Sequence, residues 1–118
     1  MDNVTIYENI SGSDGGGLYL TGGVTEIFNS HIQNNIINGI SSADGGGIYD
    51  SSINSHYDHV SITGNSTAGS AGGGMYCTSN ADLINVTVSG NEANGASSGL
   101  YFTVSFVTLQ NCIVWGNT

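Results

Sequence analysis

Apolar and polar residues alternate along much of the chain, and short alternating stretches return at regular intervals. The apolar positions of four such stretches are Val4 and Ile6, Val60 and Ile62, Val86 and Val88, and Cys112 and Val114. Thr, Ser or Tyr residues stand between and after most of them. Alternation with a period of two predicts β-strands that bury one face. A helical fold is not expected, because glycine triplets and β-branched residues oppose helix formation and no stretch keeps a 3.6-residue period.

Two repeated motifs set the interval. One is a glycine triplet followed by an apolar residue and a tyrosine, at 15–19, 45–49 and 72–76. A divergent copy at 97–101 has serine in place of the first two glycines. The other places an apolar residue three positions before an asparagine, and its asparagines are Asn9, Asn35, Asn65, Asn91 and Asn117. Successive asparagines are 26, 30, 26 and 26 residues apart. Both motifs therefore follow one period, which is typical of a solenoid repeat.

This period predicts an all-β fold, a right-handed parallel β-helix (solenoid) of about 4.5 coils with a period of about 26 residues. Each coil is expected to hold about three short strands, and residues 1–118 are expected to form a single domain. Equivalent residues of successive coils then stack about 4.8 Å apart. The five asparagines of the second motif should form a ladder whose amides bond along the stack. A second such column is expected at Asn3, Asn29, Asn85 and Asn111, interrupted by His59.

The motifs Gly-Gly-Gly-(Leu/Ile/Met)-Tyr and (Ile/Val)-x-Gly-Asn resemble repeats of right-handed parallel β-helix proteins, including those of polymorphic outer-membrane proteins and other bacterial surface proteins. The resemblance covers essentially the whole chain. It implies a β-helical fold and an extracellular or cell-surface location. It does not fix a function, because the same architecture carries adhesins, polysaccharide-active enzymes and inert spacers.

Composition narrows the range of partners. The chain has 118 residues, with no Lys, Arg or Pro, nine acidic residues and a formal net charge of −9. Nucleic-acid-binding proteins need Lys or Arg for the phosphates, and an acidic chain is repelled by nucleic acids and anionic membranes. No apolar run approaches the roughly 18 residues of a transmembrane helix, and no signal-peptide pattern is present. We therefore expect no nucleic-acid partner and no membrane insertion.

Candidate catalytic acids are few. Inverting glycosidases need two carboxyl groups roughly 6.5 to 9.5 Å apart, and the repeat places Asp2 and Asp58 in one column with Phe28 between them. Asp14 and Asp44 also align, but they precede glycine triplets, where aspartate is a common turn residue. Lyases similar in fold use basic side chains, which the chain lacks. We predict that the chain is not an enzyme and has no catalytic residues, and we rank a polysaccharide-active fragment below the other functions.

Metal-binding residues are also sparse. His56, Asp58 and His59 are close in sequence, but residues 56 and 58 should face one way while 59 falls at a turn. A solvated turn cluster is therefore favoured over a metal or acid-base site. Acidic turns offer oxygen ligands for calcium, yet the glycine-rich nonapeptide of calcium-binding β-helices is missing. We expect no metal and no cofactor.

Asparagine and cysteine residues raise two questions of covalent chemistry. Four sequons make Asn3, Asn9, Asn65 and Asn85 candidate glycosylation sites, although a chain this rich in Asn, Ser and Thr contains about that many by chance. Cys77 and Cys112 are 35 positions apart, more than one coil, so they should lie on different faces or levels. We expect free thiols rather than a disulfide.

The most distinctive outward feature is a tyrosine column. It consists of Tyr19, Tyr49, Tyr76 and Tyr101, each one residue after a buried apolar residue and two before a Thr or Ser. Stacked aromatics beside hydroxyl groups can bind sugar rings or pack against another filament. The alternative, which we favour, is that the stack stabilises the sheet through cross-strand contacts.

Neither end of the repeat shows a cap, since residues 1–10 and 109–118 both carry the strand pattern. Natural solenoids cover their end coils. Either the chain is part of a longer β-helix, or identical chains stack with residues 1–10 of one on residues 109–118 of the next, as a filament repeating at roughly 21 Å. We therefore predict a non-enzymatic extracellular structural module that associates with itself. The alternative is an adhesin or carbohydrate-binding passenger segment, with glycans as its partner.

Overall fold

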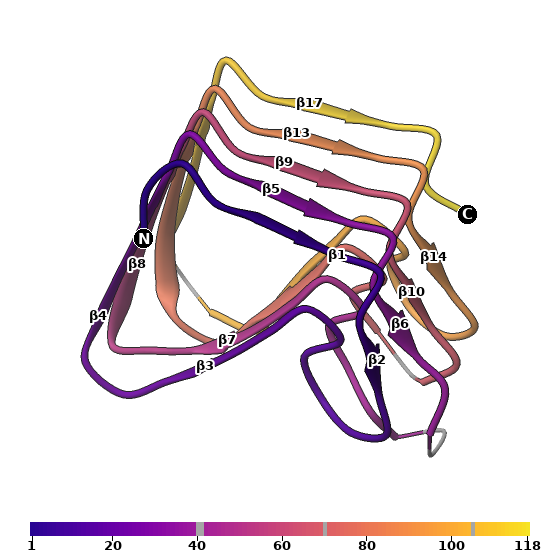
Figure 1. Ribbon diagram of the computed structural model, residues 1–118. Helices are drawn as coiled ribbons and strands as arrows, with labels where there is room; N and C mark the ends of the chain where they lie inside the picture. Colours follow the sequence, from indigo (N-terminus) through magenta and orange to yellow (C-terminus); the bar gives the residue numbers. More distant parts are fainter. Residues whose placement is uncertain (40–41, 70, 105) are drawn as a thin grey trace.

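The computed structural model describes residues 1–39, 42–69, 71–104 and 106–118, and every regular element in these ranges is a β-strand. The strands wind around one axis and turn clockwise as the chain recedes from the viewer, which makes the coil right-handed (Figure 1). The Cα atoms extend over 30 × 22 × 22 Å. The predicted parallel β-helix with a period of about 26 residues is confirmed. The described residues hold no helix long and apolar enough to cross a membrane.

Each full coil contributes one strand to each of four parallel sheets, which we name after their first strands. The β1 sheet contains β1 (Thr5–Tyr7), β5 (His31–Gln33), β9 (Ser61–Thr63), β13 (Thr87–Ser89) and β17 (Ile113–Trp115). The β2 sheet contains β2 (Ile10–Ser11), β6 (Ile36–Ile37), β10 (Ser66–Thr67) and β14 (Glu92–Ala93). The β3 sheet contains β3 (Leu18–Thr21), β7 (Ile48–Ser51), β11 (Met75–Cys77) and β15 (Leu100–Phe102). The β4 sheet contains β4 (Val24–Phe28), β8 (Asn54–Asp58), β12 (Asn80–Ile84) and β16 (Val107–Gln110).

The expectation of about three strands per coil is wrong, since the described residues of each full coil form four. Left-handed backbone corners on both sides of the β1 sheet divide the chain more finely than the alternation suggested. In the second coil these corners are Asn29, with φ 48°, and Asn34, with φ 55°. Asparagine and glycine adopt such positive φ angles at the least cost. The two-residue strands of the β2 sheet lie just beyond the second corner and are too short to show an alternation.

The second asparagine column exists, but it is a column of corners and not an amide ladder. Asn3, Asn29, His59, Asn85 and Asn111 all have φ between 48° and 55°. The amide of Asn29 donates to Asp2 at 2.9 Å, and that of Asn85 donates to Asp58 at 3.0 Å. An amide-to-amide bond joins Asn111 to Asn85 at 3.4 Å. The repeated asparagines of this column are therefore explained by backbone conformation.

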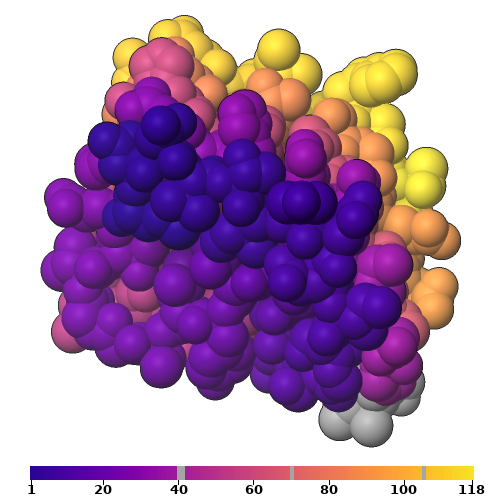
Figure 2. All heavy atoms as spheres, viewed as in Figure 1, coloured from indigo at the N-terminus to yellow at the C-terminus, as the bar shows by residue number. Residues whose placement is uncertain are grey.

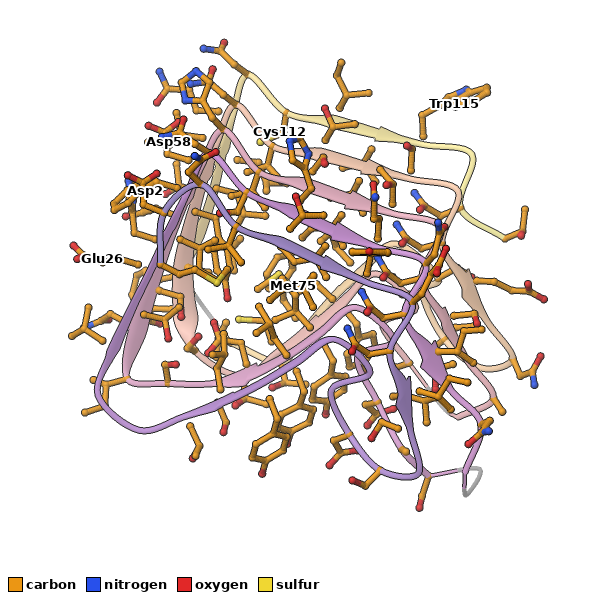
Figure 3. The ribbon with its side chains drawn as sticks, viewed as in Figure 1. Asp2, Glu26, Asp58, Met75, Cys112 and Trp115 are labelled. Carbon is orange, nitrogen blue, oxygen red and sulfur yellow. The ribbon has the colours of Figure 1, made fainter. Side chains whose placement is uncertain are left out.

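The core fills the interior of the coil with one inward side chain stacked on the next. Ile62 and Val88 are adjacent in register and fully buried, as the alternation predicts. Met75 and Leu83, from the β3 and β4 sheets, are also fully buried. In Figure 3, Met75 lies inside the triangle that the β1, β3 and β4 sheets enclose, and the strands of the β2 sheet lie beside this triangle. The solenoid thus has a continuous apolar interior along its axis.

The glycine triplets and the asparagines share one period because they touch each other. In the second coil, Gly45 has φ 74°. A Cβ on Gly46 would lie 2.4 Å from the carbonyl oxygen of Gly73 in the next coil. A Cβ on Gly47 would lie 2.9 Å from Nδ2 of Asn65. The first glycine therefore makes a left-handed turn, the second lets two backbones approach, and the third leaves room for the ladder asparagine.

Candidate functional site

The predicted asparagine ladder runs through all the coils. Nδ2 of each ladder residue donates to Oδ1 of the next at 2.9 to 3.0 Å, in the order Asn9, Asn35, Asn65, Asn91 and Asn117. Each Oδ1 that accepts this bond also accepts the backbone N–H of the preceding ladder residue. The three middle residues are fully buried. The ladder therefore satisfies buried polar groups that the turn would otherwise leave unpaired.

The ladder has a direction, so its two ends differ. At one end, Oδ1 of Asn9 accepts no hydrogen bond from the described residues. At the other end, Nδ2 of Asn117 donates to the carbonyl of Val88 at 3.1 Å, which leaves its second hydrogen without a described partner. One end of the coil stack thus offers an acceptor and the other a donor.

The tyrosine column forms a regular stack on the outer side of the β3 sheet. Ring centroids of Tyr19 and Tyr49 are 5.0 Å apart, those of Tyr49 and Tyr76 are 5.3 Å apart, and those of Tyr76 and Tyr101 are 5.2 Å apart. The interplanar angles are 5°, 6° and 17°. Because neighbouring rings cover each other's faces, the column presents ring edges and hydroxyl groups to solvent. Tyr19, which is 56% exposed, and Tyr101 each keep one face that no other column member covers.

Burial and nearby acidic residues raise the pKa values of the two tyrosines in the middle of this column. Burial, followed by the negative charge of Asp14, raises the pKa of Tyr49, and burial followed by Asp44 raises the pKa of Tyr76. Both carboxylates are used within the turns. Asp14 accepts the backbone N–H of Asp44 at 2.8 Å, and Asp44 accepts that of Ala71 at 2.8 Å. Asp14 and Asp44 are therefore turn residues that bond one coil to the next, as their position before the glycines predicts.

The candidate carboxylates Asp2 and Asp58 do lie in one column with Phe28 between them. Figure 3 shows both on the outer side of the coil, on the same side as Glu26. Asp58 contacts His59, with Nδ1 2.8 Å from the carboxylate oxygen, and accepts the amide of Asn85. The hydrogen bond from Asn85 lowers the pKa of Asp58. Asp58 is thus held in its charged form within a corner.

The three residues of the histidine cluster only partly converge. His59 meets Asp58, whereas the ring of His56 packs against Phe28 at a centroid distance of 5.7 Å. His56 lies between Glu26 and Asp82 in the outward column of the β4 sheet. Among the described residues no group of three or more His, Cys, Asp or Glu side chains is arranged to hold a metal ion.

A buried acidic network was missed by the sequence analysis. Asp50 is fully buried at an inward position of β7, where it accepts the hydroxyl of Tyr57 at 2.6 Å, the backbone N–H of Ser52 at 2.9 Å and a short bond from the hydroxyl of Ser55. Burial and the charge of Asp50 raise the pKa of Tyr57 well above its ordinary value. No alternation marked this site, since Asp50 occupies the column of Leu20 and Cys77. The network is sealed from solvent and ties β7 to β8 across the corner between them.

Among the residues that the structure describes, no buried side-chain nitrogen or oxygen lacks a hydrogen-bond partner.

The two cysteines are free, as predicted. Cys77 is fully buried, and burial raises the pKa of its thiol, whereas Cys112 is half-buried at the last coil.

The four sequons differ in exposure. Asn3 and Asn9 are exposed, and Asn85 is half-buried at a corner. Asn65 is fully buried, and both its amide hydrogens are donated, to Asn91 and to the carbonyl of Ile32. A glycan on Asn65 is incompatible with this fold, because the attached sugar would displace the ladder. Asn3, Asn9 and Asn85 stay predictions, and of these the exposed Asn9 also donates both amide hydrogens, to Asn35 and to the carbonyl of Tyr7.

The two end faces expose inward positions that are buried elsewhere. Leu109 is 50% exposed and Val114 is 49% exposed, whereas their counterparts one coil earlier, Leu83 and Val88, are fully buried. At the opposite face a hollow of about 240 Å³ is lined by Met1, Leu18, Leu20, Val24, Thr25, Glu26 and Ile27. A second, shallow hollow of about 340 Å³ lies over the β2 sheet and has Glu92 as its one titratable side chain. Figure 2 views the first coil from outside the stack.

Comparison of the chain with protein-family models, curated proteins and solved structures finds no match. The sheet topology itself defines the class, which is a parallel β-solenoid with side-chain columns of asparagine and tyrosine.

Proposed function

We propose that the chain is a structural module whose coil stack continues beyond both end faces, into further coils or into second copies of itself. The observation that supports this most strongly is the change in burial at equivalent positions. Val114 and Leu109 are about half exposed, while Val88 and Leu83, in the same columns, are not exposed at all. Covering such a face removes apolar area from water at about 25 cal/mol per Å². It also pairs the open edges of β15, β16 and β17.

The chemistry of the outer surface agrees with a structural role. Its repeated outward residues are tyrosines stacked on one another, and three of its carboxylates, those of Asp14, Asp44 and Asp58, are bonded into turns and corners. The resemblance of the motifs to repeats of polymorphic outer-membrane proteins supports an extracellular or cell-surface location. We carry this location over as part of the proposal.

Size-exclusion chromatography with light scattering, followed by electron microscopy, tests the proposal over a range of protein concentrations. We expect end-to-end assemblies that grow with concentration. Val114→Asp places a charge on the end face and should abolish them, whereas Thr87→Asp, on the outer side of a middle coil, should leave them unchanged. A chain that stays monomeric at all concentrations, with its end coils protected from hydrogen exchange, would contradict the proposal.

Glycan binding is the second candidate, and it is favoured by the exposed face of Tyr19. Sugars stack on the faces of aromatic rings, and along most of the column these faces are covered. Tyr101 also keeps an uncovered face, so we expect any binding on a glycan array to be lost when all four tyrosines of the column, Tyr19, Tyr49, Tyr76 and Tyr101, are replaced by Ala. Retention of the signal in that variant would remove the tyrosine column from consideration.

A further inference from the structure

Residues 1–10 and 109–118 occupy the same positions of the repeat. Asn3 and Asn111 both have φ 53°, and Asn9 and Asn117 are the two ends of one ladder. The following position shows the same equivalence. The N–H of Thr118 bonds to the carbonyl of Asn91, as that of Ile36 bonds to Asn9. The two segments are therefore interchangeable in backbone geometry.

This equivalence creates a conflict when two copies stack directly. If β1 of a second copy pairs with β17, the second copy's β3 lies two strand spacings, about 10 Å, beyond β15. The reason is that β15 comes half a coil before β17, while β3 comes half a coil after β1. A strand-wide gap remains over the β3 sheet. In addition, an in-register joint needs a whole number of coils, so this arrangement repeats at about 24 Å and not at roughly 21 Å.

We propose that residues 109–118 of one copy replace residues 1–10 of the next copy, so that β17 pairs with the neighbour's β5 after its β1 has left. This inference rests on the proposed function and deepens it, because it defines the joint, that is, the contact between the last coil of one copy and the first coil of the next. Position 11 of the neighbour then follows position 118 without overlap. The neighbour's β3 and β4 pair directly with β15 and β16, and the filament repeats at four coils, or about 19 Å.

The columns of both copies continue across this joint. Leu18 of the neighbour lies on Leu100, and its Ile27 lies on Leu109, as the registers of the β3 and β4 sheets require. These contacts cover Leu18 and Ile27 of the neighbour, which line the hollow of about 240 Å³ together with Met1 before residues 1–10 leave. The neighbour's Tyr19 stacks on Tyr101. The free hydrogen of the Asn117 amide meets Oδ1 of the neighbour's Asn35, the acceptor that Asn9 uses within one chain.

Charge and polarity favour the exchange. Residues 1–10 carry Asp2 and Glu8, whereas residues 93–118 carry no charged side chain. Ile113 and Trp115, 60% and 75% exposed, stand at outward positions that other coils fill mostly with polar residues. Figure 3 shows Trp115 projecting from the last coil into solvent. Replacement therefore removes two acidic side chains from the joint of a chain of net charge −9, and it places Ile113 and Trp115 beside the neighbour's His31 and Gln33.

Ser98 limits the strength of the joint. It stands where the earlier coils have Gly16, Gly46 and Gly73, and a Cβ on Gly46 would lie 2.4 Å from the carbonyl oxygen of Gly73. In the joint, the Cβ of Ser98 faces the carbonyl of the neighbour's Gly16 in the same way. We expect Ser98→Gly to lower the concentration at which assembly begins.

A reversible lock on β1 tests the exchange in the full chain. Thr5 and His31 are Cα partners on the outer side of β1 and β5, at a spacing that a disulfide can bridge. The variant Thr5→Cys/His31→Cys, made with Cys112→Val to remove the competing thiol, should assemble when reduced and stay monomeric when oxidised. The matched control Ser61→Cys/Thr87→Cys, with the same Cys112→Val change, links two middle coils and should assemble in both states.

The outcomes separate the two proposals. Equal assembly of the oxidised and reduced lock variant, or an axial repeat near 24 Å, would overturn the exchange and leave end-to-end stacking in place. Absence of assembly in the unmodified chain would overturn the exchange, and together with protection of its end coils from hydrogen exchange it would overturn the proposed function as well. Loss of assembly in the oxidised lock variant alone, with a repeat near 19 Å, is the expected result.

Discussion

Removal of one ladder side chain from the middle of the stack should be among the most destabilising changes in this protein. In Asn65→Ala the N–H and the amide of Asn35 lose their shared acceptor, which lies at 3.0 and 2.9 Å. The carbonyl of Ile32 loses its amide donor at 2.9 Å. These groups are inside the coil, where Asn35 and Asn65 are fully buried. The substitution therefore leaves buried polar groups without a hydrogen-bond partner, which costs more than the loss of the same hydrogen bonds at an exposed site.

The size of the effect follows from this inventory. An unsatisfied buried donor costs about 1 to 3 kcal/mol, so the two donors of Asn35 alone predict a loss of about 2 to 6 kcal/mol in the free energy of unfolding. A domain of this size is stabilised by about 5 to 15 kcal/mol in total. Asn65→Ala is thus expected to approach the limit at which the fold survives.

Asn9→Ala provides the matched control at the end of the same ladder. Asn9 is exposed, and Oδ1 of Asn35 keeps the backbone N–H of residue 9 when the side chain is removed. We expect a loss below about 1 kcal/mol, because water replaces the two lost bonds, to Asn35 and to the carbonyl of Tyr7. Urea unfolding, monitored by circular dichroism at matched protein concentration, measures both variants. Equal effects of the two substitutions would refute the argument that burial of the ladder determines its contribution.

Two further changes test other parts of the coil. Gly47→Ala should destabilise by more than about 1 kcal/mol, because its Cβ would lie 2.5 Å from the Gly74 carbonyl, whereas Gly12→Ala, with no atom within 4 Å, should be close to neutral in thermal unfolding. Burial beside Asp50 favours the neutral phenol of Tyr57 and so raises its pKa. The contribution of this phenol to the free energy of unfolding is complete below pH 10 and falls as the pH rises toward the pKa of the folded state. Alkaline unfolding should therefore be less steep in Tyr57→Phe, and an unchanged pH profile would show that Asp50 does not hold this phenol.

The sequence predicted features that a coil must repeat. Equivalent residues stack along the axis, so an inward valine or a ladder asparagine has to reappear at each turn, and the period becomes visible without any other information. The asparagine ladder, the inward alternation and the outward tyrosine column were all found in this way. The strand count was wrong because corners such as Asn34 interrupt the alternation over too few residues.

Features that occur once per chain gave no such signal. Asp50 is an acid in an inward column whose other members include Leu20 and Cys77, and its partners Ser55 and Tyr57 belong to the following strand. Serine and tyrosine at alternate positions are equally common on solvent-facing strands. The convergence of three hydrogen-bond donors on one carboxylate depends on the corner between β7 and β8, which residue periodicity does not encode.

The contrast between two outward columns bears on function. Outward positions of the β4 sheet vary freely from Glu26 to His56 to Asp82, so the geometry of the coil does not require an outward residue to repeat. The tyrosine nevertheless repeats in all four strands of the β3 sheet, one per coil, and the rings lie face to face with centroids 5.0 to 5.3 Å apart. A surface that binds sugars would expose aromatic faces, whereas in this arrangement most ring faces pack against the ring of a neighbouring coil. The repetition is explained by cohesion between coils, which is the property that a stacking structural module needs at every turn and again at its joints.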